Sequence, residues 1–342
     1  MTARFRVALV GCGQMARVWL ECALERIDTE VVALVDLRLE SAVALRERYG
    51  LNCAVFDEVE GALRSSRANL VFDVTPPEMH ESVTLTALAA GCDVFGEKPL
   101  ASSLEAARRM VSAASSSGRL YAMMQNRRYL PGIRALHHGV RQGTLGRLGM
   151  LSADFFLAPH FGGFRDAMAH PLLLDMSIHT FDAARFISGA DALWVQAHAF
   201  NPQGSWYAGA AAAVCLFGMS DGSVFSYRGS WCAEGLPTSW EAEWRAVGSQ
   251  GSARWDGESL PVTEVLLEPS QPGSNREHRM TLSSAWNGRE GHAGCLDELF
   301  SALLEGHGPP TVCSDNLRSL EMVFGAVQSA EAAGGRVQLG SE

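Results

Sequence analysis

A single lysine stands out among the residues that could do chemistry. The chain has 28 basic residues, and Lys98 is the only lysine among them. A lysine can release its proton inside a protein, whereas an arginine keeps its charge. A lysine retained in such an arginine-rich chain favours a chemical role for Lys98. The alternatives are chance and a pocket too small for a guanidinium group.

Asp175 and His179 form a second group of candidates. They lie four residues apart in a segment whose spacing predicts a helix over about residues 172–187, so we expect them to share one helix face. Histidine titrates near neutral pH and can accept the proton that alcohol oxidation releases. A carboxylate on the same face can hold substrate hydroxyls, and a nearby ammonium group such as that of Lys98 can stabilise a developing alkoxide.

Structural roles are the alternatives for this group. His179 could be a buried core histidine, and Asp175 could pair with a neighbouring group. Asp182, one turn beyond His179, is expected to support the site rather than react. A zinc site made of His170, Asp175 and His179 is a less favoured alternative.

The glycines near the N-terminus predict a phosphate-binding turn. Gly11, Gly13 and Ala16 fit the pattern GxGxxA between an apolar segment at residues 4–10 and a helical pattern at residues 14–27. In this pattern the first glycine allows the tight turn, and the second lets the backbone approach a pyrophosphate at the helix N-terminus. Asp36 follows about 20 residues on, at the end of the next predicted strand, where a carboxylate accepts hydrogen bonds from ribose hydroxyls. Its charge disfavours a 2′-phosphate and so favours NAD, although the neighbouring Arg38 keeps NADP possible.

The elements that must position these residues alternate between strand and helix in the first third of the chain. This alternation predicts an α/β Rossmann domain over residues 1–125, with a doubly wound parallel sheet. The predicted strands are 4–10, 30–35, 70–74, 93–96 and 120–124, and the predicted helices are 14–27, 39–49, 78–90 and 104–117.

The pattern changes after residue 125. Residues 126–342 predict an α+β domain with a large, mainly antiparallel open sheet, and the closing helix could pack back on the first domain. Asp221-Gly222 between two apolar segments indicates a hairpin. The predicted helices are 132–142, 172–187, 291–304 and 316–332, with a long strand at 148–157 and further strands between 192 and 268.

Composition narrows the function classes. A length of 342 residues suits two domains, and a formal net charge of −10 disfavours nucleic acid as a partner. The longest apolar run, residues 208–217, is too short for a membrane span, and residues 7–10 are too short for the apolar part of a signal peptide. The eight cysteines include no CxxC pair, which disfavours structural zinc and a disulfide framework. We therefore expect a cytoplasmic protein that does not bind membranes.

Two further motifs complete a resemblance to a known family. Thr75-Pro76-Pro77 with His80 and Glu97-Lys98-Pro99, together with the glycine turn and the Asp175–His179 pair, resemble the Gfo/Idh/MocA family of oxidoreductases over nearly the whole chain. The resemblance implies an NAD(P)-dependent dehydrogenase or reductase, without a metal, that acts on a secondary alcohol or ketone of a sugar, cyclitol or related polyol. It implies that Lys98 lies near the nicotinamide and contacts the reacting hydroxyl, and that His179 accepts the proton.

The resemblance also implies roles for other positions. Thr75, Pro76 and His80 would line the nicotinamide side, Glu97 would lie near the ribose or nicotinamide, and the open sheet would form the interface of a homodimer or homotetramer. The complete set of expected cofactor residues is Gly11, Gly13, Gln14, Met15, Ala16, Asp36, Arg38, Thr75, Pro76, His80, Glu97, Lys98 and Gln125. The expected substrate residues are Lys98, Arg128, Tyr129, Arg165, His170, Asp175 and His179.

One segment departs from the family pattern. Many members carry a glycine-rich stretch before the aspartate, whereas this chain has Met168-Ala169-His170-Pro171-Leu172. The bulkier residues should reshape the pocket and make His170 an additional candidate for substrate contact. Two other functions stay open: an NAD-dependent glycosidase that oxidises its substrate transiently, and a cofactor-sensing regulatory protein without catalysis. The tryptophans of the second half are expected in the core or an interface: Trp206, Trp231, Trp240, Trp244 and Trp255.

Overall fold

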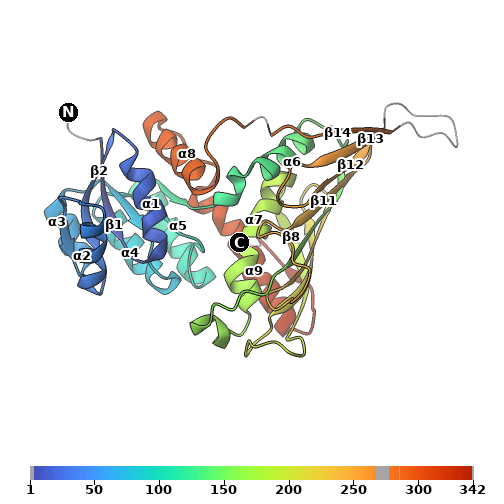
Figure 1. The fold of residues 1–342 in the computed structure, drawn as a ribbon, viewed down its shortest axis with the longest axis horizontal. Coiled ribbons are helices and arrows are strands. Elements are labelled where there is room, and N and C mark those ends of the chain that lie inside the picture. The colour runs from blue at the N-terminus through green and yellow to red at the C-terminus, as the bar shows by residue number, and fades with distance from the viewer. Residues whose placement is uncertain (1–3, 267–276, 285, 341–342) are drawn as a thin grey trace. The chain divides into compact units, whose positions relative to one another are not determined.

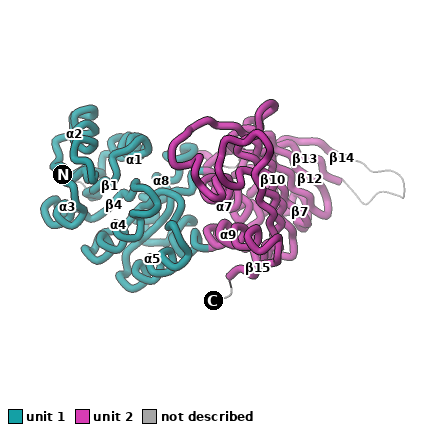
Figure 2. Tube along the Cα trace, turned by 90° about the horizontal axis from the view of Figure 1, so that it is seen from below, with its two compact units in different colours: residues 1–126, 289–317 teal, residues 127–288, 318–342 magenta. Residues whose placement is uncertain are grey.

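The chain divides into two compact units. The computed structural model describes residues 4–266, 277–284 and 286–340. Unit 1 comprises residues 1–126 and 289–317, and unit 2 comprises residues 127–288 and 318–342 (Figure 2). The sequence predicts a boundary after residue 125, with a closing helix that could pack back on the first domain. In the structure, residues 289–317 cluster with unit 1.

Unit 1 contains a six-stranded parallel sheet in the order β3-β2-β1-β4-β5-β6, which confirms the predicted doubly wound fold. Its strands are β1 (Phe5–Val10), β2 (Thr29–Val35), β3 (Ala54–Phe56), β4 (Leu70–Asp73), β5 (Asp93–Gly96) and β6 (Tyr121–Met123). Its helices are α1 (Gln14–Leu24), α2 (Leu39–Arg48), α3 (Val59–Ser66), α4 (Pro77–Ala89), α5 (Leu104–Ser117) and α8 (Gly291–Glu305). The sequence patterns predict neither β3 nor α3; a three-residue edge strand such as β3 carries too little periodicity to be recognised.

Aromatic packing explains why α8 belongs to unit 1. The ring centroid of Phe300 lies 5.1 Å from that of Phe5 and 5.4 Å from that of Phe95. Phe300 is fully buried, so this distant segment completes the core beside the sheet. The backbone N–H of Met123 also donates to the carbonyl of Thr311, at 2.9 Å. Local sequence patterns cannot show a long-range contact of this kind.

Unit 2 is built on a nine-stranded sheet in the order β14-β13-β12-β11-β7-β10-β9-β8-β15. Among the described strands of this sheet, only β7 and β10 pair in parallel, which confirms the predicted, mainly antiparallel sheet. Asp221-Gly222 joins β9 to β10 as predicted, with Gly222 at a φ of +85°. The strands are β7 (Leu148–Phe156), β8 (Ala192–Phe200), β9 (Ala212–Met219), β10 (Val224–Ser230), β11 (Glu243–Gly248), β12 (Gly251–Trp255), β13 (Val262–Leu266), β14 (Glu277–Thr281) and β15 (Val337–Gln338).

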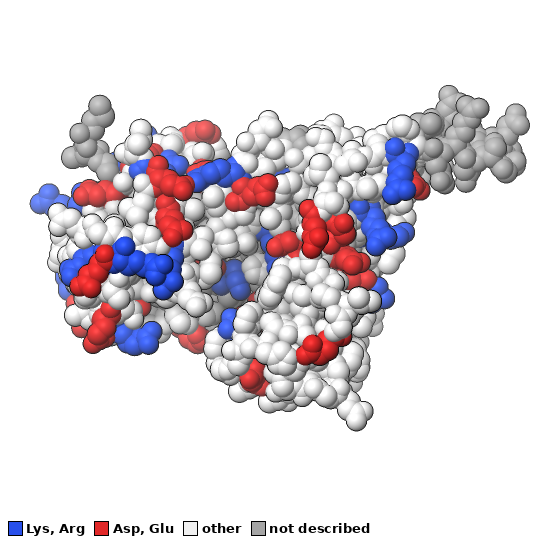
Figure 3. Space-filling model, in the orientation of Figure 1, with Lys and Arg blue, Asp and Glu red and all other residues white. Residues whose placement is uncertain are grey.

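Helices cover one face of this sheet (Figure 1): α6 (Pro131–Arg141), α7 (Ser177–Ser188) and most of α9 (Cys313–Glu331). Trp231, Trp244 and Trp255 are buried in the core of unit 2, as expected. The described helices include none with the length and apolarity needed to cross a membrane. On the face shown in Figure 3, basic and acidic side chains are interspersed.

Candidate active site

The turn after β1 has the geometry that a dinucleotide requires. Gly11 has a φ of +88°, and a Cβ added there would lie 2.5 Å from the carbonyl oxygen of Val74, so the protein itself requires glycine. Gly13 has an ordinary φ of −77°, and an added Cβ would meet nothing within 4 Å. Packing within the chain therefore does not explain Gly13, whereas a pyrophosphate at the N-terminus of α1 would. These residues fit the predicted cofactor.

This difference between the two glycines gives a paired prediction. Gly13→Val should raise the Kd for NAD at least tenfold and change the free energy of unfolding by no more than about 1 kcal/mol, since a Cβ at this helix N-cap meets nothing within 4 Å. Gly11→Ala should destabilise the fold by more than about 1 kcal/mol, because of left-handed backbone strain and the clash with Val74. Chemical denaturation and calorimetric titration with NAD measure the two effects. Unchanged NAD affinity in Gly13→Val would contradict the assignment of this turn.

Backbone amides hold the carboxylate of Asp36 at the end of β2. The N–H of Cys12 donates to Oδ2 and the N–H of Arg38 donates to Oδ1, each at 2.9 Å. Each oxygen keeps a further lone pair for a ribose hydroxyl. Burial, followed by the charge of Asp36, raises the pKa of the Cys12 thiol to about 12, so this cysteine stays protonated beside the turn. Arg38 is exposed, as are Gln14 and Met15.

His80 links the turns that follow β4 and β5. Its Nε2 lies 2.8 Å from the carbonyl oxygen of Thr75, and its Nδ1 lies 2.9 Å from that of Pro99. The imidazole is buried, and the hydroxyl of Thr75 donates to the buried Asp73 at 2.6 Å. Burial raises the pKa of Asp73, and the charge of His80 opposes that rise. His80 therefore braces the two turns through both ring nitrogens.

Glu97 anchors the backbone of Lys98. Its Oε2 accepts a hydrogen bond from the Lys98 N–H at 2.9 Å, and its Oε1 accepts one from the Trp19 indole at 3.0 Å. The peptide bond between Lys98 and Pro99 is cis. Glu97 is buried, so its carboxylate ties this turn to α1. This contact with Trp19 was not foreseen, because no local pattern links residues so far apart in the sequence.

Gln125 offers a further polar group in unit 1. It follows β6 and is almost completely buried, and its Nε2 has no hydrogen-bond acceptor among the residues that the structure describes. A buried amide group without a partner is costly, so such an atom commonly meets a ligand or a water molecule. Its position fits the predicted cofactor role.

Asp175 and His179 lie at the start of the long buried helix of unit 2. Asp175 belongs to a π-helical turn, Leu172–Met176, and His179 lies in the first turn of α7. The expectation of one regular α-helix from residue 172 was therefore wrong at its beginning, because the wider turn is not visible in apolar spacing. Such π turns often occur at functional sites. The Nε of Arg165 donates to Oδ2 of Asp175 at 2.7 Å, so two predicted substrate residues do meet.

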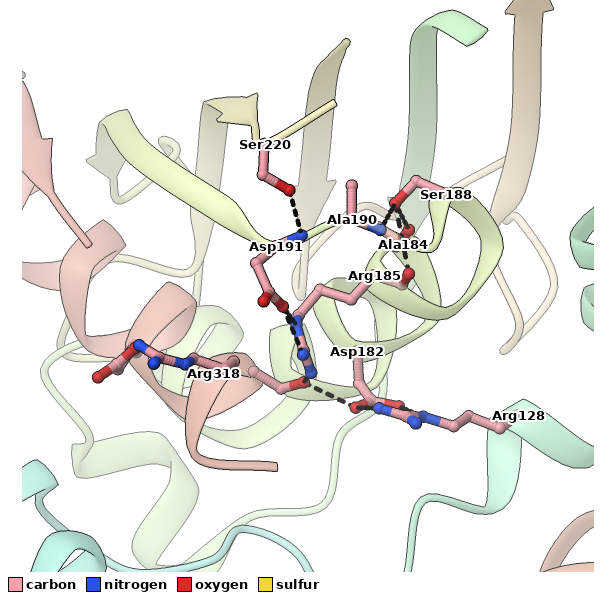
Figure 4. Close-up of polar contacts among 11 residues, drawn as sticks. Arg128, Asp182, Ala184, Arg185, Ser188, Ala190, Asp191, Ser220 and Arg318 are labelled. Atoms are coloured by element: carbon pink, nitrogen blue, oxygen red, sulfur yellow. Dashed lines mark hydrogen bonds and ion pairs between the residues drawn. The ribbon is translucent and has the colours of Figure 1, made fainter. Parts of the chain in front are cut away.

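Arg128 is engaged in a buried ion pair, which argues against its predicted substrate role. Its Nε and Nη2 donate to the two carboxylate oxygens of Asp182, each at 2.7 Å (Figure 4). Ser319 donates to the same carboxylate at 2.7 Å and accepts from Arg185 at 2.9 Å. Because removing one partner would leave a buried charge, this network stabilises α7. Through these contacts Asp182 holds α7 to Arg128 and Ser319.

Tyr129 is likewise part of the core rather than of an open pocket. It is fully buried, and its ring centroid lies 5.6 Å from that of Trp286. The guanidinium carbon of Arg134 lies 4.6 Å from the Tyr129 ring centroid. This packing also argues against the predicted substrate role of Tyr129.

His170 takes part in a contact with the end of α9. Its Nε2 lies 3.4 Å from a carboxylate oxygen of Glu331. The segment before it is held by the loop at 208–210, since the N–H of Ala210 donates to the carbonyl of Ala169 at 2.8 Å. This geometry favours a structural role for His170. Within the described part of the chain, no three His, Cys, Asp or Glu side chains gather as a metal site requires.

Comparison of the sequence with known protein families identifies the family of this chain. Residues 5–125 match the family described as an oxidoreductase family with an NAD-binding Rossmann fold, and residues 133–254 match the GFO/IDH/MocA C-terminal domain. The chain belongs to the Gfo/Idh/MocA oxidoreductase family. The predicted family, its oxidoreductase class and the NAD-binding Rossmann fold are thereby confirmed.

Relatives within the Gfo/Idh/MocA family include dehydrogenases of sugars and inositols. An uncharacterized protein of Sinorhizobium fredii is 28% identical over 95% of this chain and 93% of its own length. D-glucoside 3-dehydrogenase of Escherichia coli is 35% identical over 58% of this chain, and inositol 2-dehydrogenase of Pseudarthrobacter chlorophenolicus is 34% identical over 57%. The matches span 59% and 58% of these two enzymes.

The fold extends over the whole length of a solved structure. An oxidoreductase from Agrobacterium radiobacter, crystallised with NAD+, L-tartaric acid and magnesium, matches with a TM-score of 0.86 over 99% of both chains. The sequence identity is 20%, so this match shows the shared fold alone.

Proposed function

We propose that the protein is an NAD-dependent dehydrogenase or reductase acting on a secondary alcohol or ketone of a sugar, cyclitol or related polyol. The observation that carries the proposal is the anchoring of Lys98. Glu97 holds the backbone of the only lysine at the end of β5, in the same sheet whose glycine turn fits a dinucleotide. The sugar and inositol dehydrogenases among the relatives support the substrate class.

The residues of the chain then have complementary tasks. When bound, the nicotinamide supplies the acceptor or donor of hydride. The Lys98 ammonium group polarises the substrate oxygen, and His179 takes or returns the hydroxyl proton. Asp175, held by Arg165, accepts hydrogen bonds from neighbouring substrate hydroxyls and orients the reacting carbon.

A screen of sugars, inositols and sugar acids, followed by NADH absorbance, tests this proposal. We expect turnover of at least one of them, with NAD preferred because Asp36 repels a 2′-phosphate. At least tenfold better efficiency with NADP would overturn the NAD preference. Release of sugar from a glycoside without net NADH would favour the glycosidase alternative, and NAD binding without turnover would favour a regulatory protein.

We also propose that the uncovered face of the unit 2 sheet pairs copies of the chain into a homodimer or homotetramer. Alternate residues of β9 point outward, so Val214 and Leu216 are exposed while Cys215 and Phe217 are buried. Met150 and Phe200 add further exposed apolar side chains from β7 and β8. Exposed apolar side chains on several strands of one sheet face favour association.

Leu216→Glu should therefore shift the protein toward monomers, because it would bury a charge in each interface. Light scattering coupled to size-exclusion chromatography measures the change. Leu39→Glu is the matched control, since Leu39 is an exposed leucine on α2 of unit 1. A wild-type protein that is monomeric throughout a micromolar range would refute the proposed interface.

The proposed compartment is the cytoplasm. All eight cysteines are free thiols, which suits a reducing environment.

A further inference from the structure

The loop that carries Arg165 also presents an unusual group of aromatic rings. Phe161 is 58% exposed and Phe164 is 68% exposed, and Trp240 from a second loop is 45% exposed. Large apolar side chains are costly to expose in water, and adjacent exposed rings mark binding surfaces more often than isolated ones do. We call Phe161, Phe164 and Trp240 the aromatic platform.

Buried aromatic residues pack against Phe161 and Trp240 of the platform. Trp231 is fully buried, and its ring lies 5.7 Å from that of Trp240 and 6.3 Å from that of Phe161, centroid to centroid. Trp231 in turn stacks on the buried Phe155 of β7 at 5.5 Å. The rings of Phe161 and Trp240 lie 6.1 Å apart. Phe161 and Trp240 therefore rest on the core of unit 2, and ordering these two rings costs little entropy when a ligand binds.

Arg165 connects the platform to Asp175. Its guanidinium carbon lies 5.4 Å from the Phe161 ring centroid and 4.7 Å from that of Phe164, within the range of cation–π contacts. Its Nε donates to Asp175. The remaining guanidinium nitrogens, Nη1 and Nη2, have no partner among the described residues. One side chain thus joins the proposed substrate carboxylate, free hydrogen-bond donors and two exposed rings.

His160, next to Phe161, and Glu234, on the Trp240 loop, form a further polar pair beside the platform. His160 Nε2 lies 2.9 Å from a carboxylate oxygen of Glu234, and the imidazole stacks on Trp206 with 3.8 Å between ring centroids. Aromatic faces combined with hydrogen-bonding groups match a ligand that has both a flat C–H face and hydroxyls, which describes a pyranose ring. A purely apolar ligand would leave these polar groups unused.

We propose that the aromatic platform and Arg165 form a subsite for a second sugar ring, so that the preferred substrates are disaccharides or longer glycosides rather than free monosaccharides. This inference rests on the proposed function, because it places the oxidised ring at Asp175. The second ring stacks on Phe161 and Trp240, and its hydroxyls accept hydrogen bonds from the Nη groups of Arg165.

Matched pairs of substrates test the subsite on the full-length enzyme with NAD: glucose and cellobiose, galactose and lactose, and mannose and mannobiose. For the pair that is oxidised, wild type should show a higher kcat/KM for the disaccharide. The ratio of kcat/KM for disaccharide over monosaccharide should fall at least tenfold in Phe161→Ala and in Trp240→Ala. Leu236→Ala, a fully exposed residue of the Trp240 loop that lies outside the platform, is the control and should keep the wild-type ratio.

The outcomes separate the subsite from the proposed function. A wild type that prefers monosaccharides, or variants that lose activity equally on both substrates, would overturn the subsite and leave the dehydrogenase assignment standing. If none of these sugars is oxidised, the wider screen of inositols and sugar acids decides the dehydrogenase proposal, and saturation-transfer NMR with cellobiose, lactose and mannobiose decides the subsite. Saturation transfer to either sugar ring that is seen with wild type and disappears in Phe161→Ala supports the subsite. Absence of saturation transfer with wild type refutes the subsite. A change of oligomeric state in the Phe161 and Trp240 variants would instead assign the platform to a second copy of the chain.

Discussion

Lys98→Ala should lower kcat at least a hundredfold and leave the Kd for NAD nearly unchanged. The ammonium group is proposed to stabilise the charge that develops on the substrate oxygen, and loss of such a group typically costs between about a hundredfold and a thousandfold in turnover. The backbone of the turn should persist, because Glu97 holds it through the Lys98 N–H and not through the side chain. Steady-state kinetics and an NAD titration measure both quantities.

Lys98→Arg distinguishes charge from shape. Arginine keeps the positive charge but is larger and planar, and it does not release a proton. If Lys98 persists in this arginine-rich chain because an arginine cannot replace it there, this variant should also lose most activity. Arg109→Ala is the control, since Arg109 forms an exposed ion pair with Glu81 at the surface of unit 1. Full activity in Lys98→Ala would refute the proposed catalytic role of Lys98.

His179→Gln should also reduce turnover at least a hundredfold, because it removes the proposed proton acceptor. Glutamine approximates the size and polarity of histidine but cannot take up a proton, and general base catalysis contributes about a hundredfold to ten-thousandfold. Activity of the variant should recover in part as the pH rises, since hydroxide can then accept the proton. The pH dependence of kcat for wild type and variant provides the measurement.

The fold of the His179 variant needs a separate check, because this histidine is buried in α7. Thermal unfolding of His179→Gln should stay within a few degrees of wild type if its role is chemical. His307→Gln is the matched control: His307 is exposed on unit 1 and pairs with Glu305, which raises its pKa. A His179 variant with normal stability and normal turnover would exclude the proposed base.

Local patterns were sufficient for much of unit 1. Gly11 and Gly13 follow an apolar strand and begin a helix, and this arrangement carries its meaning within a few residues. The ribose-binding role of Asp36 was predicted from its place at the end of the second predicted strand alone. The doubly wound parallel sheet was predicted from the alternation of strands and helices, because βαβ connections leave few topologies open. Its strand order, which includes β3, came from the structure. The hairpin at Asp221-Gly222 in unit 2 was also predicted, because its turn residues and both of its strands are neighbours in the sequence.

Contacts between distant segments decided the roles that the sequence left open. Arg128 and Tyr129 follow the last strand of the parallel sheet and so resembled pocket residues, but Asp182 and Trp286 bury them. Their positions relative to one another depend on how α7 and the sheet of unit 2 pack. The attachment of α8 through Phe300 depends in the same way on a tertiary core.

The sequence by itself thus determined the family, the cofactor-binding turn and the identity of Lys98, Asp175 and His179 as candidates, because residue type and short spacing carry that information. Only the tertiary structure decided which charges are already satisfied. In the structure Asp182 pairs with Arg128. Arg165 donates to Asp175 through its Nε, and its guanidinium group lies over the exposed ring of Phe164. The physical reason is that a side chain's partners are chosen by packing, which brings together residues that no sequence spacing relates.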